Sequence, residues 1–390
     1  MTGWTDRLRD ELAKLETGGL LRLLTPCEPQ GRLIHVGGVV LANLGSNDYL
    51  GLAQHPRLID AAVEATRRFG TGATASRLVS GHTHLIERVE QRFAQFKHSE
   101  AALLCPTGTM ANHAVLTGLA REGDLICADK LSHASLMDAA RACGATLRVY
   151  PHLNYEKLER LLVRHKDAPQ RFIATDSVFS MDGDTADLPA LCVLAQRHGA
   201  VLIVDEAHAT GVLGMTGAGL AEAQGVAQRV DITVSTASKA LGGLGGVITA
   251  RRPVIDTLIN RARSFIYTTA VQPAQAAVIE AALDVVKQEP WRRQRLAEIS
   301  GRVHAALRTT GLKPEHGAVA QPCTPIVPLI VGEPQDALSL SQHLARHGVF
   351  APAIRPPSVA GGSSRVRLSL RADLEVADID RLCEAVDRWR

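Results

Sequence analysis

An acid and a lysine that follow neighbouring apolar runs are the residues most able to do chemistry in this sequence. Asp205 lies at the end of the run VLIVDE, and Lys239 follows the run DITVST within the small-residue segment ASKALGGLGG. Ligands of open α/β sheets bind beyond the carboxyl ends of the strands, so both side chains are expected at one crevice. The small residues leave room for a flat ring, which favours a Schiff-base role for Lys239 over that of an exposed loop lysine. The alternative for Asp205 is a helix cap at a strand end.

A pyridoxal phosphate (PLP) enzyme needs a set of groups of this kind. Its lysine forms an imine, a carboxylate keeps the pyridine nitrogen protonated, and backbone amides with hydroxyls hold the phosphate. The segment Thr107–Asn112 follows the apolar run AALLC and opens a helix pattern, which makes an anion site at a helix N-terminus. A plain strand-to-helix turn explains this segment equally well. Thr236, three residues before Lys239, adds a hydroxyl on the same side. Together these residues predict PLP as the cofactor.

Other motifs in the sequence lack the context that their chemistry needs. The segment Gly70–Ala75 matches G-x-G-x-x-A, but it follows a helix pattern rather than a strand. The segment Asp205–His208 spells the DEAH of helicase ATPases, yet no G-x-x-x-x-G-K-[ST] loop is present to hold phosphates. No H-E-x-x-H or G-x-S-x-G motif occurs, so neither a zinc protease nor an α/β-hydrolase is expected. No metal site is predicted, and His82 and His84 are expected as surface or capping residues.

Length, charge and cysteine usage exclude several classes of protein. The 390 residues exceed the roughly 250–300 at which one hydrophobic core usually stops growing, so two domains are expected. The net charge is only +3 without any block of like charges, which argues against nucleic acid as a partner. Seven cysteines without a CxxC pair predict reduced thiols rather than disulfides. Neither an apolar leader nor a run of about 18 apolar residues occurs, so a cytoplasmic protein without a membrane segment is expected.

Short apolar runs alternating with helix patterns are expected to position these residues. This rhythm is typical of a mainly parallel sheet with helices on both faces, an α/β fold. The predicted strands are AALLC (101–105), LICAD (125–129), TLRVY (146–150), RFIATDS (171–177), VLIVDE (201–206), DITVST (231–236) and GVITA (246–250).

The segments on either side of this sheet follow other patterns. Residues 4–16 and 56–69 are expected to form helices and residues 32–44 a hairpin. The stretch 271–310 is rich in helix patterns with a break at Pro290, and the tail alternates short strands and helices. The sequence thus predicts three parts, an N-terminal segment (1–45), a large α/β domain (46–285) and a small C-terminal α+β domain (286–390).

Six longer motifs resemble those of the α-oxoamine synthases, and the resemblance covers nearly the whole chain. It implies a fold-type I PLP transferase whose large domain has a mainly parallel seven-stranded sheet. Members of this family condense an amino acid with an acyl thioester and release CO₂. The motifs are Ser46–Gly51, Ala75–Gly81, Asp129–Ser135, Val178–Asp184, Val204–Gly211 and Ala353–Val359.

Two of these motifs resemble one branch of the family. Ser76–Gly81 and Ala353–Val359 are similar to the branch that uses L-alanine and a pimeloyl thioester, on CoA or a carrier protein, in biotin synthesis. Relatives that use glycine usually carry T-R-N-I-S-G in place of the first segment. A sibling that joins glycine or serine to another acyl-CoA remains an alternative. So does a PLP lyase of the threonine-aldolase kind, whose S-G-T-M-A-N motif resembles Thr107–Asn112.

The resemblance also implies a role for each matched residue. Lys239 would bind PLP as an imine, Asp205 would bind the pyridine nitrogen, and His133 would stack on the ring; with His208, these are the implied catalytic residues. The other implied cofactor contacts are Ser180 and His208 near the ring oxygen, the Gly108 and Thr109 amides, the Thr236 hydroxyl, and Thr268 and Thr269 from the second subunit of a homodimer with a shared active site. The implied substrate contacts are Arg22, Asn47, His133, Ser358 and Arg367. One departure is Thr109, where the family commonly has an aromatic residue, although a backbone contact survives that change.

Overall fold

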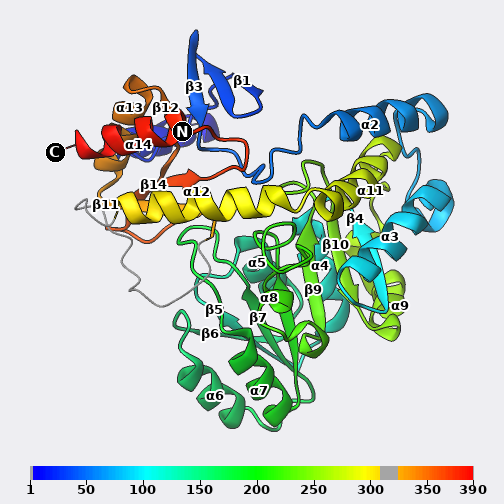
Figure 1. Ribbon diagram of the computed structural model, residues 1–390. Helices are drawn as coiled ribbons and strands as arrows, with labels where there is room; N and C mark the ends of the chain where they lie inside the picture. Colours follow the sequence, from blue (N-terminus) through cyan, green and yellow to red (C-terminus); the bar gives the residue numbers. More distant parts are fainter. Residues whose placement is uncertain (1–2, 308–323, 390) are drawn as a thin grey trace. The chain divides into compact units, whose positions relative to one another are not determined.

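The structure is a computed structural model that describes residues 3–307 and 324–389 (Figure 1). It divides into two compact units. Unit 1 contains the described residues up to Tyr49, Met181–Gly183, and those from Arg295 onward, whereas unit 2 contains Leu50–Ser180 and Asp184–Gln294. Parts of the predicted N-terminal segment (1–2), helix-rich stretch and C-terminal domain (308–323 and 390) lie outside the described residues.

Unit 2 is built on a seven-stranded sheet in the order β4-β10-β9-β8-β7-β5-β6. β10 runs antiparallel to both of its neighbours, and the other pairs are parallel. Each predicted run forms one strand. The mainly apolar runs suit strands buried on both faces, whereas the edge run TLRVY is partly exposed. The predicted mainly parallel α/β sheet is confirmed. The strands are β4 Ala101–Cys105, β5 Leu125–Asp129, β6 Thr146–Tyr150, β7 Arg171–Asp176, β8 Ala200–Asp205, β9 Ile232–Thr236 and β10 Gly246–Ala250.

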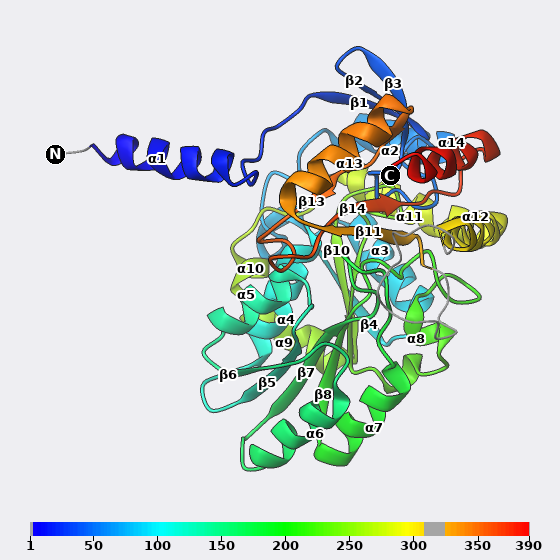
Figure 2. The same cartoon turned by 90° about the vertical axis from the view of Figure 1, so that its left-hand side faces the viewer.

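Helices cover both faces of this sheet. Figure 2 shows α4 and α5 on one side of β7 and β8, with α7 on the other. The helices of unit 2 are α2 Pro56–Phe69, α3 His84–Phe96, α4 Gly108–Leu119, α5 Ala134–Ala142, α6 Tyr155–Arg164, α7 Leu188–His198, α8 Leu220–Ala223, α9 Arg252–Arg261, α10 Arg263–Ile266 and α11 Pro273–Gln288. A further helix, α12 Trp291–Leu307, begins in unit 2 and continues in unit 1.

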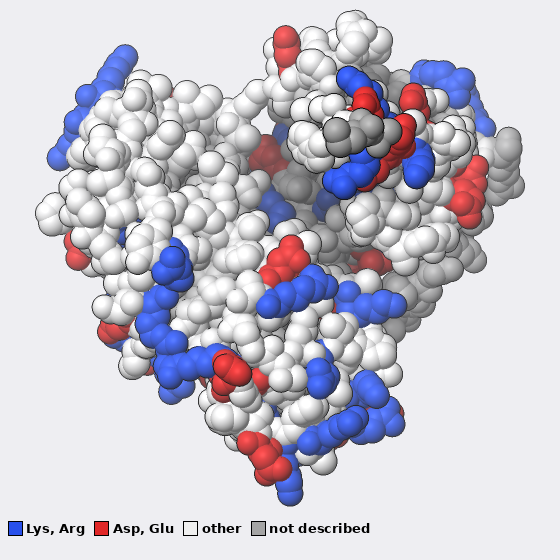
Figure 3. Space-filling model, turned by 180° about the vertical axis from the view of Figure 1, so that it is seen from behind, with Lys and Arg blue, Asp and Glu red and all other residues white. Residues whose placement is uncertain are grey.

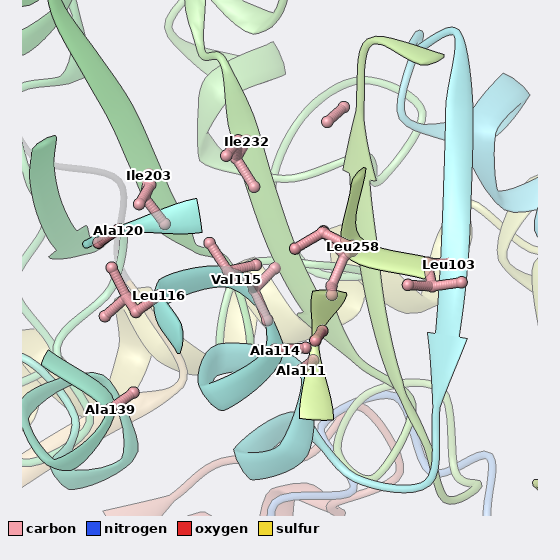
Figure 4. Close-up of a cluster of buried hydrophobic side chains, with 14 of the residues drawn as sticks. Leu103, Ala111, Ala114, Val115, Leu116, Ala120, Ala139, Ile203, Ile232 and Leu258 are labelled. Atoms are coloured by element: carbon pink, nitrogen blue, oxygen red, sulfur yellow. The ribbon is translucent and has the colours of Figure 1, made fainter. Parts of the chain in front are cut away.

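The core of unit 2 surrounds α4, the helix that follows the predicted anion-binding segment. Val115 of α4 lies among strand residues that include Ile203 and Ile232, while Leu258 of α9 packs nearby (Figure 4). Gly118 permits this approach, since a Cβ there would lie 2.9 Å from Leu258 Cδ2. The N-terminal turn of α4 is therefore held rigidly at the carboxyl edge of the sheet.

Unit 1 contains two small sheets with helices beside them. The hairpin of β2 and β3 turns at Gly37 and Gly38, whose φ angles of 57° and 81° favour glycine. One sheet has the order β1-β2-β3-β12, with β1 Cys27–Gln30, β2 Leu33–Val36, β3 Val39–Asn43 and β12 Val349–Phe350. The antiparallel sheet β11-β14-β13 comprises β11 Ile326–Gly332, β14 Ser364–Ser369 and β13 Ala353–Ile354. The helices are α1 Trp4–Thr17, α13 Pro334–Arg346, α14 Val376–Asp387 and the greater part of α12.

Surface charge and helix hydropathy bear on the expectations that the protein binds neither nucleic acid nor a membrane. On the face shown in Figure 3, basic and acidic side chains of the described residues are interspersed rather than gathered into one basic stripe. Within residues 3–307 and 324–389, no helix is both long and apolar enough to span a bilayer.

Candidate active site

The carboxylate of Asp205 is buried at the carboxyl end of β8 and is fixed by two neutral donors. The Ala207 amide donates to Oδ1 at 2.8 Å, and Asn112 Nδ2 donates to Oδ2 at 2.7 Å. Asn112 also donates to Ser135 Oγ at 2.8 Å, whereas its own Oδ1 is buried without a partner among the described atoms. Asp205 thus holds one orientation at the edge where a ligand is expected. The sequence did not identify Asn112 as a site residue.

His133 stands beside this group as the N-cap of α5. Its Nδ1 accepts a hydrogen bond from the Ser135 amide at 3.2 Å and lies 2.7 Å from the Ser135 hydroxyl. Desolvation lowers the pKa of His133, the Asp205 charge opposes this effect, and the Lys239 charge adds to it. The neutral imidazole is therefore favoured, which suits a ring that stacks on a flat cofactor.

Asp176 is a second buried acid at this edge, and the sequence analysis did not select it. It ends β7 directly opposite Asp205 of β8, and its Oδ1 accepts the His133 amide at 3.0 Å. Burial raises the pKa of Asp176 well above its ordinary value, and the Asp205 charge adds to the rise. The protonated, neutral form of Asp176 is therefore favoured. The sequence feature that could have identified Asp176 is its place as an acid at the end of the run RFIATD.

The turn between β4 and α4 offers unpaired amides to an anion. Thr107 caps the helix by accepting the Met110 amide at 3.2 Å. Within the described chain, the Gly108 and Thr109 amides have no acceptor, and they open a helix of 12 residues. Such a terminus favours a phosphate. The absent side chain of Gly246 makes this geometry possible, since a Cβ there would overlap the Thr107 carbonyl.

The Thr236 hydroxyl lies next to this turn. A Cβ built on Gly108 would be 3.5 Å from Thr236 Oγ1, which also donates to the Gly245 carbonyl at 2.9 Å. Ser238 Oγ lies 2.8 Å from the same oxygen and adds a second, exposed hydroxyl that the sequence analysis missed. These contacts place the predicted Thr236 hydroxyl, together with that of Ser238, beside the unpaired amides.

Three other predicted residues follow the same strand ends. Lys239 is half-buried after β9, and its charge acts on both His133 and Asp176. Ser180 follows β7 and His208 follows β8, and both are buried. The structure thus brings the predicted lysine to the same edge as the buried acids.

Thr268 and Thr269 make no hydrogen bonds to the described residues around Asp205. Thr269 follows α10 and forms an isolated bridge with Ser76. In the described chain, no hydrogen bond joins either threonine to Asp205, His133 or Thr236. Thr269 is exposed and Thr268 is half-buried.

His133 lies in unit 2, and the other four predicted substrate residues form two clusters within unit 1. Arg367 Nη2 donates to Asn47 Oδ1 at 3.1 Å and to the Tyr49 hydroxyl at 3.2 Å, while its Nε is buried without a partner among the described atoms. Burial raises the pKa of Tyr49 to about 12 against the opposing charge of Arg367. Tyr49 therefore stays a neutral partner of the guanidinium at any ordinary pH.

The second cluster joins Arg22 to the loop that carries Ser358. Arg22 Nη2 donates to the carbonyls of Arg355 at 3.3 Å and Pro356 at 2.9 Å, and the Ser358 amide donates to the Arg355 carbonyl at 3.1 Å. The side chains of Arg22 and Ser358 are exposed. The structure thus brings these two predicted residues to one loop.

The donor set in unit 2 fits pyridoxal phosphate. An amine, a fixed buried carboxylate, a neutral imidazole and a helix N-terminus with unpaired amides are the groups that this cofactor requires. Among the described residues, no group of His, Cys, Asp or Glu could hold a metal ion. The fold and these groups define a PLP-binding enzyme whose lysine lies at the carboxyl edge of an α/β sheet.

The chain belongs to the aminotransferase class I and II family, whose sequence profile matches residues 39–386. It is 43% identical over 387 residues to the 8-amino-7-oxononanoate synthase of Geobacter sulfurreducens, covering 98% of both chains. It is 44% identical to the enzyme of that name from Anaeromyxobacter dehalogenans, covering 98% of this chain and 95% of the relative.

Two solved structures extend the comparison. A serine palmitoyltransferase from S. paucimobilis with a bound PLP–myriocin aldimine is 28% identical, with a TM-score of 0.92 over 98% of this chain and 96% of that one. The 8-amino-7-oxononanoate synthase from Francisella tularensis is 27% identical, with a TM-score of 0.76 over 89% of this chain and 97% of that one. The predicted fold type and family resemblance are confirmed.

Proposed function

We propose that this chain condenses L-alanine with a pimeloyl thioester to give 8-amino-7-oxononanoate, CO₂ and a free thiol, a step of biotin synthesis. PLP is its cofactor, as the sequence predicted. The relatives named for this reaction share 43–44% identity with nearly the whole chain, and a solved relative contains PLP. The observation that carries the proposal is the fixed Asp205 carboxylate at the same sheet edge as Lys239 and the unpaired Gly108 and Thr109 amides.

The residues of unit 2 would divide the work around the cofactor. When bound, PLP supplies an electron sink that stabilises negative charge on the Cα of the amino acid. Asp205 would keep the pyridine nitrogen protonated, and His133 would cover one face of the ring. The Gly108 and Thr109 amides would bind the phosphate with the Thr236 hydroxyl. His208 and Ser180 would contact the ring oxygen.

Lys239 would act twice, first as the covalent anchor and then as a base. The Nζ amine would then accept the Cα proton of the amino acid, which requires an accessible neutral amine although a free lysine has a pKa of about 10.4. The Cα then attacks the thioester carbonyl and the thiol leaves. The carboxylate would then leave as CO₂, and a proton would return to Cα to give the amino ketone.

We assign the substrate groups to unit 1. Arg367 would pair with the alanine carboxylate through its unpartnered Nε, while Asn47 and Tyr49 hold its Nη2. Arg22 and Ser358 would contact the acyl chain. We further propose a cytoplasmic homodimer in which Thr268 and Thr269 serve the site of the partner subunit.

The first experiment records the visible spectrum of the purified protein and then follows thiol release from pimeloyl-CoA. L-alanine, glycine and L-serine are added separately, because a serine palmitoyltransferase is also a structural relative. Alanine-dependent thiol release by a protein that absorbs in the visible supports the proposal. Release with glycine or serine alone would indicate a sibling reaction, and amino acid cleavage without a thioester would indicate a lyase. A protein that cannot be loaded with PLP would contradict the proposal outright.

A further inference from the structure

His152, in unit 2, lies between two carboxylates that the proposed chemistry does not use. Its Nδ1 is 2.9 Å from Asp129 Oδ1, and its Nε2 is 2.6 Å from Asp184 Oδ2. The His152 side chain is 14% exposed, that of Asp184 is 10% exposed, and Asp129 is completely buried. Because a carboxylate offers only acceptors, both ring nitrogens serve as donors, and the ring is an imidazolium.

Asp129 connects this ion group to the turn that leads into His133. Its Oδ1 also accepts the Leu131 amide at 2.8 Å, and its carbonyl accepts the Ser132 amide at 3.1 Å. Its Oδ2 accepts the Leu153 amide at 2.9 Å, which ties the residue after His152 to the same carboxylate. The orientation of Asp129 therefore sets the backbone immediately before His133.

Asp184 connects the ion group to the loop that carries Ser180. Its carbonyl accepts the Phe179 amide at 3.0 Å, and Val178 bridges Thr185, so the loop closes on itself. The Phe179 ring packs edge-on against His152, with centroids 4.4 Å apart and planes at 89°. One imidazolium thus contacts Phe179 and Asp184, which lie on either side of the segment that leaves unit 2 after Ser180 and returns at Asp184.

The charges around His152 make its protonation essential. Asp184 Oδ1 is buried without a partner among the described atoms, so His152 is the cation that compensates this carboxylate. The other titratable groups that interact with Asp129 are the phenols of Tyr150 in β6 and Tyr155 in α6 and the buried carboxyl of Asp176. Burial lowers the pKa of His152, but the hydrogen bonds and charges of Asp129 and Asp184 outweigh it and raise the pKa to about 9.

We propose that His152 is a positioning residue for the cofactor site: held between Asp129 and Asp184, it fixes the His133 turn and the Ser180 loop relative to one another. This inference rests on the proposed function, because His133 and Ser180 receive their importance from PLP. It assigns to His152 no contact with cofactor or substrate.

The test measures PLP affinity of the apoprotein without substrate, together with kcat and KM for alanine and the melting temperature. His152→Gln should bind PLP about tenfold more weakly, as expected for the loss of a buried charged hydrogen bond. Its kcat should fall by about tenfold or more while KM for alanine changes less than about twofold. His198→Gln is the matched control, since His198 at the end of α7 is also 14% exposed and pairs with a single carboxylate, that of Glu159 in α6. The PLP affinity and kcat of this variant should stay unchanged.

A second variant covers the case in which His152→Gln does not fold. Asp184→Asn removes one of the two charges that hold the proton on His152, so the pH above which PLP affinity falls should drop by about one unit or more relative to wild type. Wild-type PLP affinity in His152→Gln, or an unchanged pH profile in Asp184→Asn, overturns the inference. Failure of the wild type itself to bind PLP is a separate result, which overturns the proposed function and this inference with it.

Discussion

At the scale of single residues, Asp205 is the position where charge matters more than shape. Asn112 and the Ala207 amide donate to its two oxygens. An asparagine has nearly the same size and keeps one of these two acceptors, but it loses the charge. We expect Asp205→Asn to retain bound PLP while kcat falls by about 100-fold or more, since an uncharged amide does not maintain a pyridinium. Visible absorbance reports the cofactor, and thiol release reports turnover.

Lys239→Arg provides the comparison for this experiment. A guanidinium keeps the positive charge near His133 and Asp176 but forms no imine under these conditions, so the visible absorbance should be absent. Near-normal turnover in Asp205→Asn would remove the electron-sink role from Asp205.

Single residues also show where sequence reasoning reaches its limit. Asp205 and Lys239 were predictable because each follows an apolar run whose carboxyl end is a binding edge. Asn112 was not, because it lies inside a helix pattern and its partner Asp205 is 93 residues away. The unpaired Oδ1 of Asn112 and the Nη2 contacts of Arg367 exist only in three dimensions, so no local pattern marks them.

At the scale of elements, the seven strands of unit 2 were predictable to within one residue, since each coincides with a short run rich in apolar and β-branched residues. The strand β1 was missed because its residues, CEPQ, are all exposed and give no apolar signal. The closeness of the β4–α4 turn to β10 was also invisible in the sequence, although it depends on the missing side chain of Gly246.

The close packing of that turn leads to a prediction. Gly246→Ala would force a Cβ against the Thr107 carbonyl and displace the amides of Gly108 and Thr109. We expect a loss of about 1–3 kcal/mol in unfolding free energy and weaker PLP binding. Urea unfolding and PLP titration measure the two effects. Gly301→Ala in α12 is the control, because a Cβ there meets nothing within 4 Å and should stabilise the helix slightly. Equal PLP affinity in both variants would contradict the assignment of this turn to the phosphate.

The ion group of His152 gives stability a defined pH dependence. Its pKa rises from 6.5 unfolded to about 9 folded, which corresponds to about 3 kcal/mol. A pKa that is raised in the folded state stabilises that state fully at any pH below the pKa of the unfolded state. The contribution of His152 is therefore present below pH 6.5 and is lost as the pH rises through about 9. The unfolding free energy of wild type minus that of His152→Gln should therefore shrink between pH 6 and pH 10. Urea unfolding of the apoproteins at both pH values tests this, and a difference that grows with pH would contradict it.

At the scale of the whole molecule, the two units are not simple segments of the sequence. Met181–Gly183 belong to unit 1, where Asp182 pairs with Arg365 and the Thr324 hydroxyl donates to the Gly183 carbonyl. These partners are more than 140 residues away in sequence, so composition and periodicity could not reveal the assignment. The predicted boundaries at 45/46 and 285/286 remain predictions.

The proposed dimer leads to a prediction about an active site built from two subunits. If Thr268 and Thr269 serve the partner subunit, one active site combines Lys239 of one copy with these threonines of the other. Lys239→Ala should abolish activity, and Thr268→Ala/Thr269→Ala should lower it strongly at limiting PLP. Co-expression of these two variants with different tags allows the heterodimer to be purified. It should regain about half of the wild-type activity per dimer, because one of its two sites contains every native residue.

The control heterodimer combines Lys239→Ala with Asp205→Asn. Both residues lie in unit 2 at the same sheet edge, and the charge of Lys239 acts there beside that of Asp205 on His133 and Asp176. Each site of this heterodimer then carries one defect, so activity should not return. Recovery in the control, or none in the threonine pair, would mean that Thr268 and Thr269 act within their own subunit. The exposure of Thr269 is compatible with the shared arrangement, since this threonine makes no hydrogen bond to the described residues of the Asp205 cluster.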